Sequence, residues 1–585
     1  MSNKDNVVTT GAPTVEDPMT HDSSEKANID NGYDGHHAPA RADLREDDFM
    51  TRNGLNLKSF QRRDYGTGDV ELDRSMKGRH LHMIAIGGSI GAGFFVGSGS
   101  ALTRGGPGSI LVCFSICGVM IFNVVHALGE LAVMYPVSGG FYTYSTRFID
   151  PSWGFAMGWN YVFQWLIVLP FELVVCSFTV AYWDRETSAA VWVTLFWVVI
   201  IVVNIFGTLG YAEEEFFSSC FKLAAIVIFM FIAVILICGG GPSNGNFSEY
   251  MGARLWYDPG AFQNGFSGFC AVFVTAAFSF AGTELVGLAA AESRNPAKAL
   301  PGAIKQVFWR ITLFYILGLT LVGFLVSSQD PNLMNAENAY SDGASPFVLA
   351  GKYGGLVGYD HFMNVVICVS VVSIGVSCVY GGSRTLTALA QQGYAPKLFT
   401  YVDRSGRPLY SVLFLLAWGP LAYIVVAPNG MTVFDWLLAL SALAALFTWG
   451  SICLCHIRFR TAWNRQGRSL DRIPFKAFGG VYGSWMGLIL CILILIATIY
   501  SSFVPPGGLP ETGVSYERVL MNLLALPVVA VFWIAGYFWK KDGWLRIDQI
   551  DLDVGLREHD WDEINAYRAK VAAYPAWRRA ISKLF

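Results

Sequence analysis

IAIGGSIGAGFFVGSGS, residues 84–100, opens an apolar run long enough to cross a lipid bilayer, yet it contains six glycines. Each glycine inside a helix costs about 0.5–1 kcal/mol relative to alanine. Gly93 and Gly97 form a GxxxG spacing, which lets two helices pack closely. Packing does not account for the consecutive small residues at 87–91. We expect the helix to be unwound there, because unwound backbone at this depth is tolerated where it is buried in protein or lines a cavity.

The composition of the chain indicates a polytopic membrane protein. Of its 585 residues, 53% are hydrophobic and 15% are charged, whereas a soluble domain carries about 25% charged residues. Long apolar runs alternate with short polar loops, and a membrane-spanning helix needs about 20 apolar residues. We predict twelve spans, near residues 82–103, 108–134, 154–182, 188–206, 215–238, 266–291, 306–327, 360–388, 409–427, 432–455, 484–503 and 518–539.

A second interruption is predicted in the sixth span, VTAAFSFAGTELVGLAAAESRNP. Residues 278–284 place small polar residues, a glycine and a carboxylate in its middle. The two interruptions are five spans apart, and this odd number makes the two halves inverted relative to each other, as in many secondary transporters. We expect spans one to five and six to ten to form two inverted repeats, with spans eleven and twelve appended.

The domain organisation follows from these repeats. We predict a disordered cytoplasmic N-terminal tail at 1–78, a first repeat at 79–240, an extracellular loop at 241–265, a second repeat at 266–456, a basic cytoplasmic loop at 457–483, the last two spans at 484–539 and a cytoplasmic C-terminal tail at 540–585. Basic residues in short loops set orientation. The loops after the sixth, eighth and tenth spans are basic, so both termini are expected to be cytoplasmic.

The two tails differ in composition. The N-terminal tail has too few hydrophobic residues to bury a core, which predicts disorder. The C-terminal tail contains WDEINAYRAKVAAYPAWRRAISKLF. Its aromatic and basic residues indicate either a short amphipathic element at the membrane surface or a segment that packs against cytoplasmic loops. Trafficking or ubiquitylation machinery is the class of partner expected for these tails.

Two interrupted helices that meet within the bilayer offer binding groups of both signs. The N-terminus of a half-helix favours an anion such as a carboxylate, and unpaired carbonyls favour a cation. A small zwitterion suits such a site, because the helix dipoles serve both of its ends without a buried net charge. The stretch GAGFFVG has the wrong spacing for a dinucleotide loop and no βαβ pattern surrounds it. We expect no nucleic acid partner.

Four stretches of the chain carry a resemblance to a known family. They are GGSIGAGFFVGSGSALTRGGP, GELAVMYPVSGGFYTYSTRFIDPSWGFAMGWNY, FSFAGTELVGLAAAESRNP and FTWGSICLCHIRFR. Together they resemble fungal amino acid permeases of the amino acid–polyamine–organocation superfamily, and the last looks most like the broad-range general permeases. The resemblance covers about residues 75–540. It implies the leucine-transporter fold, symport of L-amino acids with the proton as coupling ion, no cofactor, and residence in the plasma membrane.

The resemblance also implies which residues bind substrate. The α-carboxylate of an amino acid would meet backbone amides at 90–93, and its α-amino group would meet the carbonyls of Phe278, Ser279 and Ala281. Phe278 matches an aromatic gate over the substrate, and Ala92 stands where the family usually has threonine. The substrate-binding set predicted in this way comprises Ser89, Ile90, Gly91, Ala92, Gly93, Phe278, Ser279, Phe280, Ala281, Gly282 and Thr283.

Three ionisable side chains stand out within the predicted spans, where each costs about 2.5–3.5 kcal/mol and usually has a function. The resemblance places Lys222 near the position where sodium-coupled relatives hold an ion, which implies a role in proton coupling; the alternative is a lysine that snorkels to the interface. Glu172 would face the substrate pocket, carry a proton, or be a structural carboxylate. For Glu284 we favour a proton-linked or gating role. Ser373 and Ser377 are predicted to line the coupling site beside Lys222.

Other polar groups have more ordinary predicted roles. Glu130 and Glu292 lie near cytoplasmic span ends and are expected to be solvated or to form gate salt bridges. His126 is expected to be a packing histidine rather than a proton relay. The CLCH motif at 453–456 lacks the fourth ligand that a zinc site needs. We predict no metal site.

These features predict a secondary active transporter that imports amino acids with protons by alternating access. Spans one, two, six and seven would rock against spans three, four, eight and nine. One alternative is an amino acid-sensing receptor that signals through its tails, and another is a permease of narrower neutral or basic specificity. A channel would not concentrate its solute. An enzyme ranks last, because the sequence contains no metal cluster, nucleophile–base pair or phosphate loop.

Overall fold

The computed structural model describes residues 48–52, 54–63, 75–136, 141–293, 296–334, 345–427, 430–509, 513–541, 543–557, 561–575 and 577–578. Within these ranges the regular elements are helices, and β-type pairing is limited to two isolated bridges, Arg62 with Asp403 and Met76 with Ser293. The all-helical class predicted from the sequence is confirmed. Residues 1–47 of the predicted N-terminal tail lie outside the described part.

Nine helical stretches in the described ranges are long and apolar enough to cross a membrane, and one bent pair raises the number to ten. They are α5 (Gly97–Met134), α7 (Pro151–Val180), α9 (Gly207–Ile237), α10 with α11 (Gly265–Phe280 and Leu285–Ala291), α12 with η3 and α13 (Pro296–Trp309, Arg310–Gly318 and Leu319–Leu325), α16 (Tyr359–Gln391), α17 with η5 (Leu409–Leu416 and Gly419–Val426), α18 (Gly430–Arg465), α19 (Gly480–Phe503), and the pair α20 and α21 (Tyr516–Leu523 and Ala525–Lys540).

Two predicted spans are outside that set for identifiable reasons. The fourth predicted span is α8 (Ala189–Ile205), which is apolar but only 17 residues long. The first predicted span is divided into short pieces by the interruption at 88–91. Twelve spans therefore remain a prediction, whereas a multi-pass membrane protein is established.

The first span is broken where the glycines predicted it. Helix α3 (Gly78–Gly87) ends at the first of the consecutive small residues, and α4 (Ala92–Phe95) begins after Gly91, which is extended with φ −145° and ψ −148°. The chain then continues into α5, where Gly106 has a φ of +80° and is followed by Pro107. A left-handed φ favours glycine, so this position turns the chain between the first and second predicted spans.

The sixth span is broken in the same manner. Helix α10 ends at Phe280, and α11 begins at Leu285. Between them Ala281 has an extended ψ of 143° and Gly282 has a φ of +90°. Both interruptions predicted from the positions of small residues are thus confirmed.

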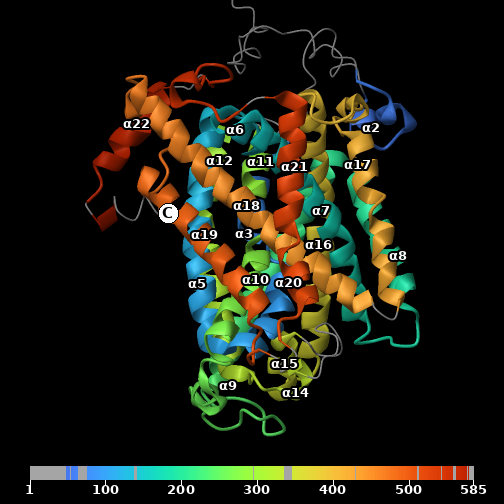
Figure 1. The fold of residues 1–585 in the computed structure, drawn as a ribbon. Coiled ribbons are helices and arrows are strands. Elements are labelled where there is room, and N and C mark those ends of the chain that lie inside the picture. Colours follow the sequence, from blue (N-terminus) through green and yellow to red (C-terminus); the bar gives the residue numbers. More distant parts are fainter. Residues whose placement is uncertain are drawn as a thin grey trace, which may run out of the picture. The chain divides into compact units, whose positions relative to one another are not determined.

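The third and eighth predicted spans form the buried centre of the bundle. Helices α7 and α16 pack along each other, and both are largely buried, whereas α9 and α19 keep much of their apolar surface exposed. Helix α7 starts at Pro151 after Asp150, whose side chain accepts a hydrogen bond from the Ser152 amide at 2.9 Å, and this is a favoured N-terminal cap. Helices α8 and α17 lie at one flank, away from α5 (Figure 1).

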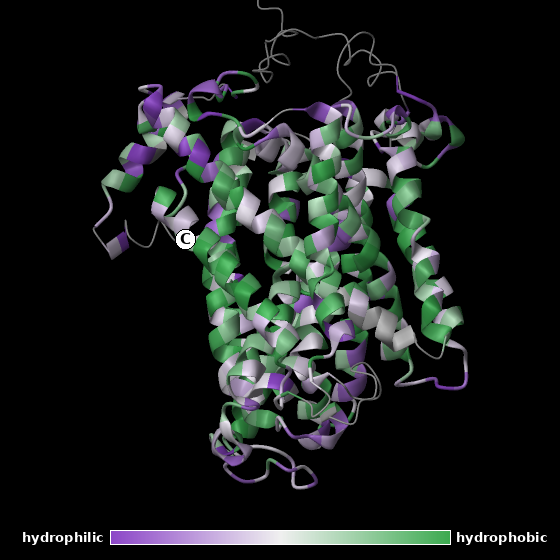
Figure 2. Ribbon diagram, in the orientation of Figure 1, coloured by the Kyte–Doolittle hydropathy of each residue, from purple (hydrophilic) through white to green (hydrophobic). Residues whose placement is uncertain are grey.

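Polar residues gather at the two ends of the bundle, and apolar residues cover the helices between them (Figure 2). One end carries the short helix α6 (Phe141–Phe148), the end of α18 and the C-terminal helix α22 (Trp561–Ala572); the other carries α14 (Pro331–Met334) and α15 (Pro346–Tyr353) (Figure 1). We call the first the basic end, because Arg458, Arg465 and Arg468 lie there.

The C-terminal segment 543–557 packs against the basic end. Arg468 donates two hydrogen bonds to Asp553, at 2.8 and 2.7 Å, and these lower the pKa of that carboxyl. The Tyr135 hydroxyl donates to the Leu552 carbonyl at 2.9 Å. Further along, Arg568 of α22 donates to the Ile473 carbonyl at 2.6 Å. Of the two alternatives for this tail, packing against loops is the one that the structure supports.

The N-terminal tail differs from the prediction over its described residues. Residues 48–63 contain α2 (Phe49–Arg52) and η1 (Leu57–Phe60) rather than disorder. The Arg407 side chain, from the loop after α16, donates to Ser59 Oγ at 3.0 Å and is paired with Asp403 at 2.6 Å. Hydrogen bonds to a distant loop hold these residues in place. The composition of the tail does not reveal such bonds, and for this reason it predicted disorder.

Candidate functional site

The two interruptions meet at Tyr315, a residue of η3. Its hydroxyl lies 2.7 Å from the Ser279 carbonyl and 3.1 Å from the Ser89 carbonyl, and Ser89 Oγ lies 3.3 Å away. The Tyr315 ring stacks on Phe280 with centroids 4.3 Å apart. A single buried phenol therefore joins main-chain groups of both interruptions. Sequence reasoning missed Tyr315, because a tyrosine in an apolar span carries no distinctive local signal.

Glycines of the first interruption allow neighbouring helices to come close. A Cβ added to Gly91 would lie 2.5 Å from Ile374 Cγ1, and one added to Gly93 would lie 2.8 Å from the Phe278 ring and 2.9 Å from Ser279 Cα. Real Cβ atoms do not approach other atoms that closely. These two glycines are therefore required by tertiary contacts with α16 and α10, in addition to any weakness that they give to the helix.

Main-chain donors at the first interruption are only partly as predicted. The Ile90 amide donates to the Gly87 carbonyl at 3.0 Å, so it is already engaged. Within the described residues the amides of 91–93 have no acceptor, as expected for the first turn of a helix. Of the amides at 90–93 that were predicted to meet a carboxylate, those of 91–93 are therefore the ones left without an acceptor among the described residues. The side chains of Ile90 and Ala92 are apolar and buried.

The second interruption supplies carbonyls. The Phe278 carbonyl accepts from the Ala281 amide at 3.1 Å, and the Ser279 carbonyl accepts from Tyr315, so each retains one lone pair. The Ala281 carbonyl has no partner within the described residues. The Thr283 hydroxyl donates to the Phe280 carbonyl at 2.6 Å. These acceptors are of the kind that an ammonium group binds.

Aromatic side chains close over the second interruption. The Phe278 ring makes an edge-to-face contact with Phe171 of α7, with centroids 5.0 Å apart. Phe278 is buried, and of the predicted substrate-binding residues Ala281 alone is partly exposed. The predicted aromatic gate therefore lies where α10 meets α7.

Lys222 is fully buried in α9 and contacts the end of the broken helix α3. Its Nζ lies 3.1 Å from Ser373 Oγ, 3.3 Å from the Gly87 carbonyl and 3.5 Å from Glu215 Oε1. The snorkelling alternative is wrong, because neither Lys222 nor Glu215 has exposed side-chain surface. The ammonium instead bridges α9, α16 and the first interruption.

Glu215 is the partner that sequence reasoning missed. Its Oε2 accepts hydrogen bonds from Ser373 at 2.7 Å and Ser377 at 3.3 Å, and its Oε1 accepts from Ser219 at 2.8 Å. Both predicted lining serines therefore bind this carboxylate. The signal was present in the sequence: Glu215 precedes Lys222 by two helical turns on one face of α9. Its place in the run Glu-Glu-Glu at 213–215 made it look like an interfacial residue.

The two predicted carboxylates have different surroundings. Glu284 accepts from the Trp449 indole at 3.0 Å and from the Gly282 amide at 3.3 Å, so it fixes the second interruption against α18. Glu172 lies in α7 beside Phe171, and its Oε2 has no hydrogen-bond partner within the described residues. The structural alternative requires a carboxylate that is hydrogen-bonded to an adjacent helix. Within the described residues, the Oε2 atom of Glu172 makes no such bond.

A buried ion pair ties α11 to α16 near the basic end. Arg384 Nε lies 3.0 Å from Glu292 Oε1, and the Thr208 hydroxyl donates to Glu292 Oε2 at 2.7 Å. The Met76 amide donates to the Glu292 carbonyl at 3.2 Å. Glu292 is 3% exposed, so of the two predicted alternatives the salt bridge is confirmed and solvation is wrong.

Glu130 is likewise buried rather than solvated. It accepts from Arg460 at 2.8 Å and from the Ala477 amide at 2.6 Å. His456, from the CLCH motif, lies between Glu130 and Ser484, at 3.2 and 2.7 Å. His126 hydrogen bonds to the Phe122 carbonyl at 2.9 Å among aromatic rings, as expected for a packing histidine.

Arg310 is a further ionisable group that sequence reasoning passed over. It lies in η3 with no exposed surface and donates to the Ala85 carbonyl at 2.8 Å and to Thr283 Oγ1 at 2.5 Å. An ionisable side chain within an apolar span usually has a function. Arg310, in the run FWRITLFYIL of the seventh span, meets this criterion as Lys222 does.

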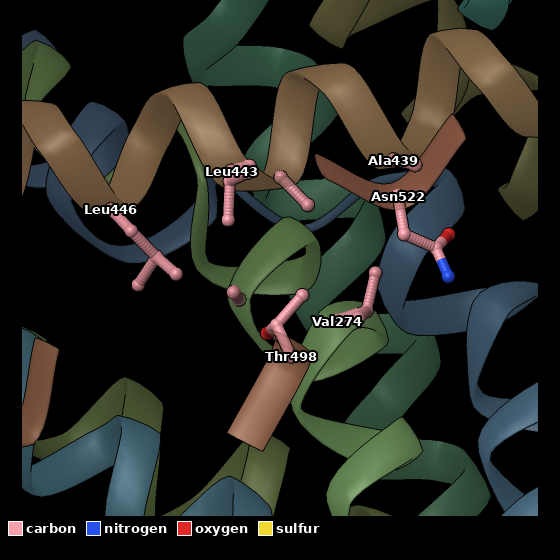
Figure 3. A pocket seen from close by; sticks show the side chains of 8 residues that line it. Val274, Ala439, Leu443, Leu446, Thr498 and Asn522 are labelled. Carbon is pink, nitrogen blue, oxygen red and sulfur yellow. The ribbon is translucent and has the colours of Figure 1, made fainter. Parts of the chain in front are cut away.

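The pocket in Figure 3 lies apart from these groups. It is lined mainly by apolar side chains of α10, α18, α19 and α20: Val274, Ala277, Ala439, Ala442, Leu443, Leu446, Thr498 and Asn522. None of the predicted substrate or coupling residues lines it. At the interruptions themselves, neighbouring side chains approach the glycines closely, so the two broken helices are in direct contact.

Comparisons with known proteins show the family of this chain. The family model described as amino acid permease matches residues 80–549. The chain is 65% identical to amino-acid permease inda1 of Hypocrea atroviridis, over 94% of this chain and 95% of that protein. It is 47% identical to the general amino-acid permease GAP1 of Saccharomyces cerevisiae, over 90% and 88%.

The chain also matches a solved structure. It is Mhp1, a nucleobase-cation-symport-1 family transporter in a closed conformation with bromovinylhydantoin bound; the match covers 80% of this chain and 99% of that one, at 13% identity and a TM-score of 0.45. The family match and the identities above decide the matter: the chain belongs to the amino acid permease family.

Proposed function

We propose that this permease is a proton-coupled symporter that imports L-amino acids across the plasma membrane by alternating access. The observation that carries the proposal is the buried pair of Lys222 and Glu215, in contact with the carbonyl end of a broken helix at Gly87. Half-helix C-termini and unwound carbonyls hold the coupling ion in many secondary transporters. A lysine ammonium at this position replaces a metal cation with a group that releases only a proton.

The substrate is held by both interruptions. Its carboxylate meets the amides of 91–93 at the start of α4, where the helix dipole is positive, and its ammonium meets the carbonyls of Phe278, Ser279 and Ala281. Since this chain has Ala92 where the family usually has threonine, the carboxylate relies on main-chain amides alone. Phe278 covers the bound amino acid.

Proton transfer uses the carboxylates around this site. Lys222 exchanges its proton through Glu215, which it contacts directly, and Ser373 and Ser377 hold Glu215 in place. Glu172, whose Oε2 has no hydrogen-bond partner among the described residues, faces the substrate side chain or relays a proton. Glu284 acts as a gating residue, because it ties the second interruption to Trp449.

The basic end is the cytoplasmic side in this proposal, with both termini inside and the tails available to trafficking or ubiquitylation machinery. Basic residues prefer cytoplasmic loops. We propose a broad substrate range, in line with the general amino-acid permease relative. A neutral or basic preference is the alternative, which uptake competition by each amino acid measures.

The decisive experiment is accumulation of a labelled amino acid in a host that lacks its own permeases. We expect accumulation above the external concentration at acidic external pH, and collapse to equilibration when a protonophore is added. The proton supplies about 2.3 kcal/mol per charge per 100 mV of membrane potential, in addition to any pH gradient. An amino acid receptor without transport would bind label but never accumulate it, and protonophore-resistant accumulation would contradict proton coupling.

A second prediction concerns the Glu292–Arg384 pair as the cytoplasmic gate. Arg384→Ala leaves a buried carboxylate without its partner, which costs about 3–5 kcal/mol in the closed state. We expect uptake to fall roughly tenfold or more, a change that needs only about 1.4 kcal/mol, while labelled substrate still leaks outward from loaded cells. The swapped double variant Glu292→Arg with Arg384→Glu should recover part of the uptake.

The matched control for this gate is Arg465→Ala. Arg465 pairs with Asp548 at 3.1 Å, but both side chains are more than half exposed. Exposed pairs contribute about 0–1 kcal/mol, so uptake should stay near the wild-type rate. Equal effects of Arg384→Ala and Arg465→Ala, or none from either, would exclude a gate at Glu292.

A further inference from the structure

Helix α3 ends between two buried cations, and the proposed coupling uses only one of them. Lys222 of α9 contacts the Gly87 carbonyl at 3.3 Å, whereas Arg310 of η3 contacts the Ala85 carbonyl at 2.8 Å. Both carbonyls belong to the last turn of α3, whose carbonyls lack helical partners and form the negative end of the helix dipole. Each cation therefore binds the same helix end, and they approach it from different helices.

The two cations differ in their counter-charges. Lys222 has Glu215 within 3.5 Å. In the described part of the chain, no acidic side chain lies within ion-pair distance of Arg310, and Glu284 is the carboxylate that acts on its charge from farther away. The Arg310 Nε has no hydrogen-bond acceptor among the described residues. Its remaining contacts are the Thr283 hydroxyl, at 2.5 Å, and the Tyr315 ring, whose centroid lies 6.0 Å from Cζ. Burying a guanidinium among mainly neutral oxygens is costly. A charged side chain that is kept inside the membrane at this cost usually has a function.

The oxygens around Arg310 are the kind of donors that bind a monovalent cation. They are a main-chain carbonyl at the end of a half-helix and a hydroxyl from the opposite interruption, and such groups coordinate coupling ions in broken-helix transporters. Thr283 also approaches Ser89 Oγ at 3.5 Å, so the set joins the two interruptions. Arginine does not lose its proton in proteins, so a charge placed here is permanent.

We propose that Arg310 is a tethered cation that fills a second ion position between the two broken spans, where it never dissociates. It holds α3 and the second interruption in register for the substrate while Lys222 gains and loses its proton on the other side of α3. Arg310 is thus a positioning residue for amino acid binding. This inference rests on the proposed transport function, and it predicts that the wild-type chain needs no sodium or potassium for uptake.

The test removes the tethered cation and offers a free one. We expect Arg310→Ala to raise the KM for uptake about tenfold or more, the effect of losing hydrogen bonds to a charged group. Guanidinium ion at millimolar concentration should restore part of the lost affinity, whereas urea, which has the same shape without the charge, should not. Neither additive should change the KM of the wild-type chain. The matched control, Arg104→Ala, removes an exposed arginine from α5 and should transport normally.

Two further variants decide the matter if Arg310→Ala fails to reach the cell surface. Arg310→Lys keeps the charge but not the fork that reaches both oxygens, and Thr283→Val removes one of those oxygens; both should show an intermediate rise in KM. A wild-type KM in the surface-expressed variants, or equal effects of guanidinium and urea on Arg310→Ala, would overturn the tethered cation. Absence of accumulation by the wild-type chain would instead reject the transport proposal itself.

Discussion

Lys222→Ala abolishes concentrative uptake, and this is the largest effect that the structure leads us to expect. The substitution removes the ammonium that contacts Ser373, Glu215 and the Gly87 carbonyl, and it leaves Glu215 buried without a cation. Breaking such a pair costs about 3–5 kcal/mol. With the proton-carrying group gone, the inward and outward steps are no longer linked to the proton gradient.

Exchange separates a coupling defect from simple misfolding. Exchange of labelled for unlabelled amino acid needs no driving force, so we expect Lys222→Ala to equilibrate label while failing to accumulate it. Glu215→Gln should weaken accumulation less severely, because the ammonium retains Ser373 and the Gly87 carbonyl. Lys352→Ala, at an exposed position of α15, is the control and should behave as the wild type. Normal proton-driven accumulation by Lys222→Ala would reject its role in coupling.

Gly91→Leu strongly weakens substrate binding without preventing membrane insertion. The first added atom would already lie 2.5 Å from Ile374 Cγ1 of α16, and the remaining three carbons would add to this overlap beside the first interruption. Overpacking of this kind costs about 1–3 kcal/mol. The bulk also covers the amides proposed for the carboxylate, so we expect affinity to fall roughly 100-fold, equivalent to about 2.7 kcal/mol.

Binding of labelled amino acid to purified protein measures this loss directly. Gly91→Ala should give a smaller loss in the same direction, because it adds only the clashing Cβ. Its control is Gly450→Ala in α18, where the nearest atom would be Leu488 Cδ1 at an ordinary 3.7 Å. Undiminished affinity in Gly91→Leu would show that the first interruption is not the binding site.

The sequence predicted where the main chain is interrupted, and it did so for a local reason. The small residues at 87–91, and the small polar residues and glycine within 278–284, weaken a helix wherever they occur, so their effect can be read without knowing the neighbours. The apolar spans are local features as well. The predicted disorder of residues 48–63 failed because their partners, Asp403 and Arg407 among them, lie far away along the chain.

The chemistry of the site was only half visible in the sequence. Lys222, Ser373 and Ser377 were found because a charge in a span is conspicuous and the family resemblance indicated the neighbouring helix. Glu215 was missed because its depth in α9 is set by tertiary packing, since composition alone places a run of three glutamates at an interface. Arg310 was overlooked although the rule used for Lys222 applied to it.

The sequence by itself determined the multi-pass helical class, the two interruptions and membership of the amino acid permease family, because these depend on composition and short motifs. Tertiary structure alone decided which groups meet. Lys222 and Gly87 are 135 residues apart, and Arg310 and Ala85 are 225 apart. A buried charge takes whatever oxygen the fold brings within about 3 Å, and that proximity arises from the packing of whole helices rather than from any one stretch of chain.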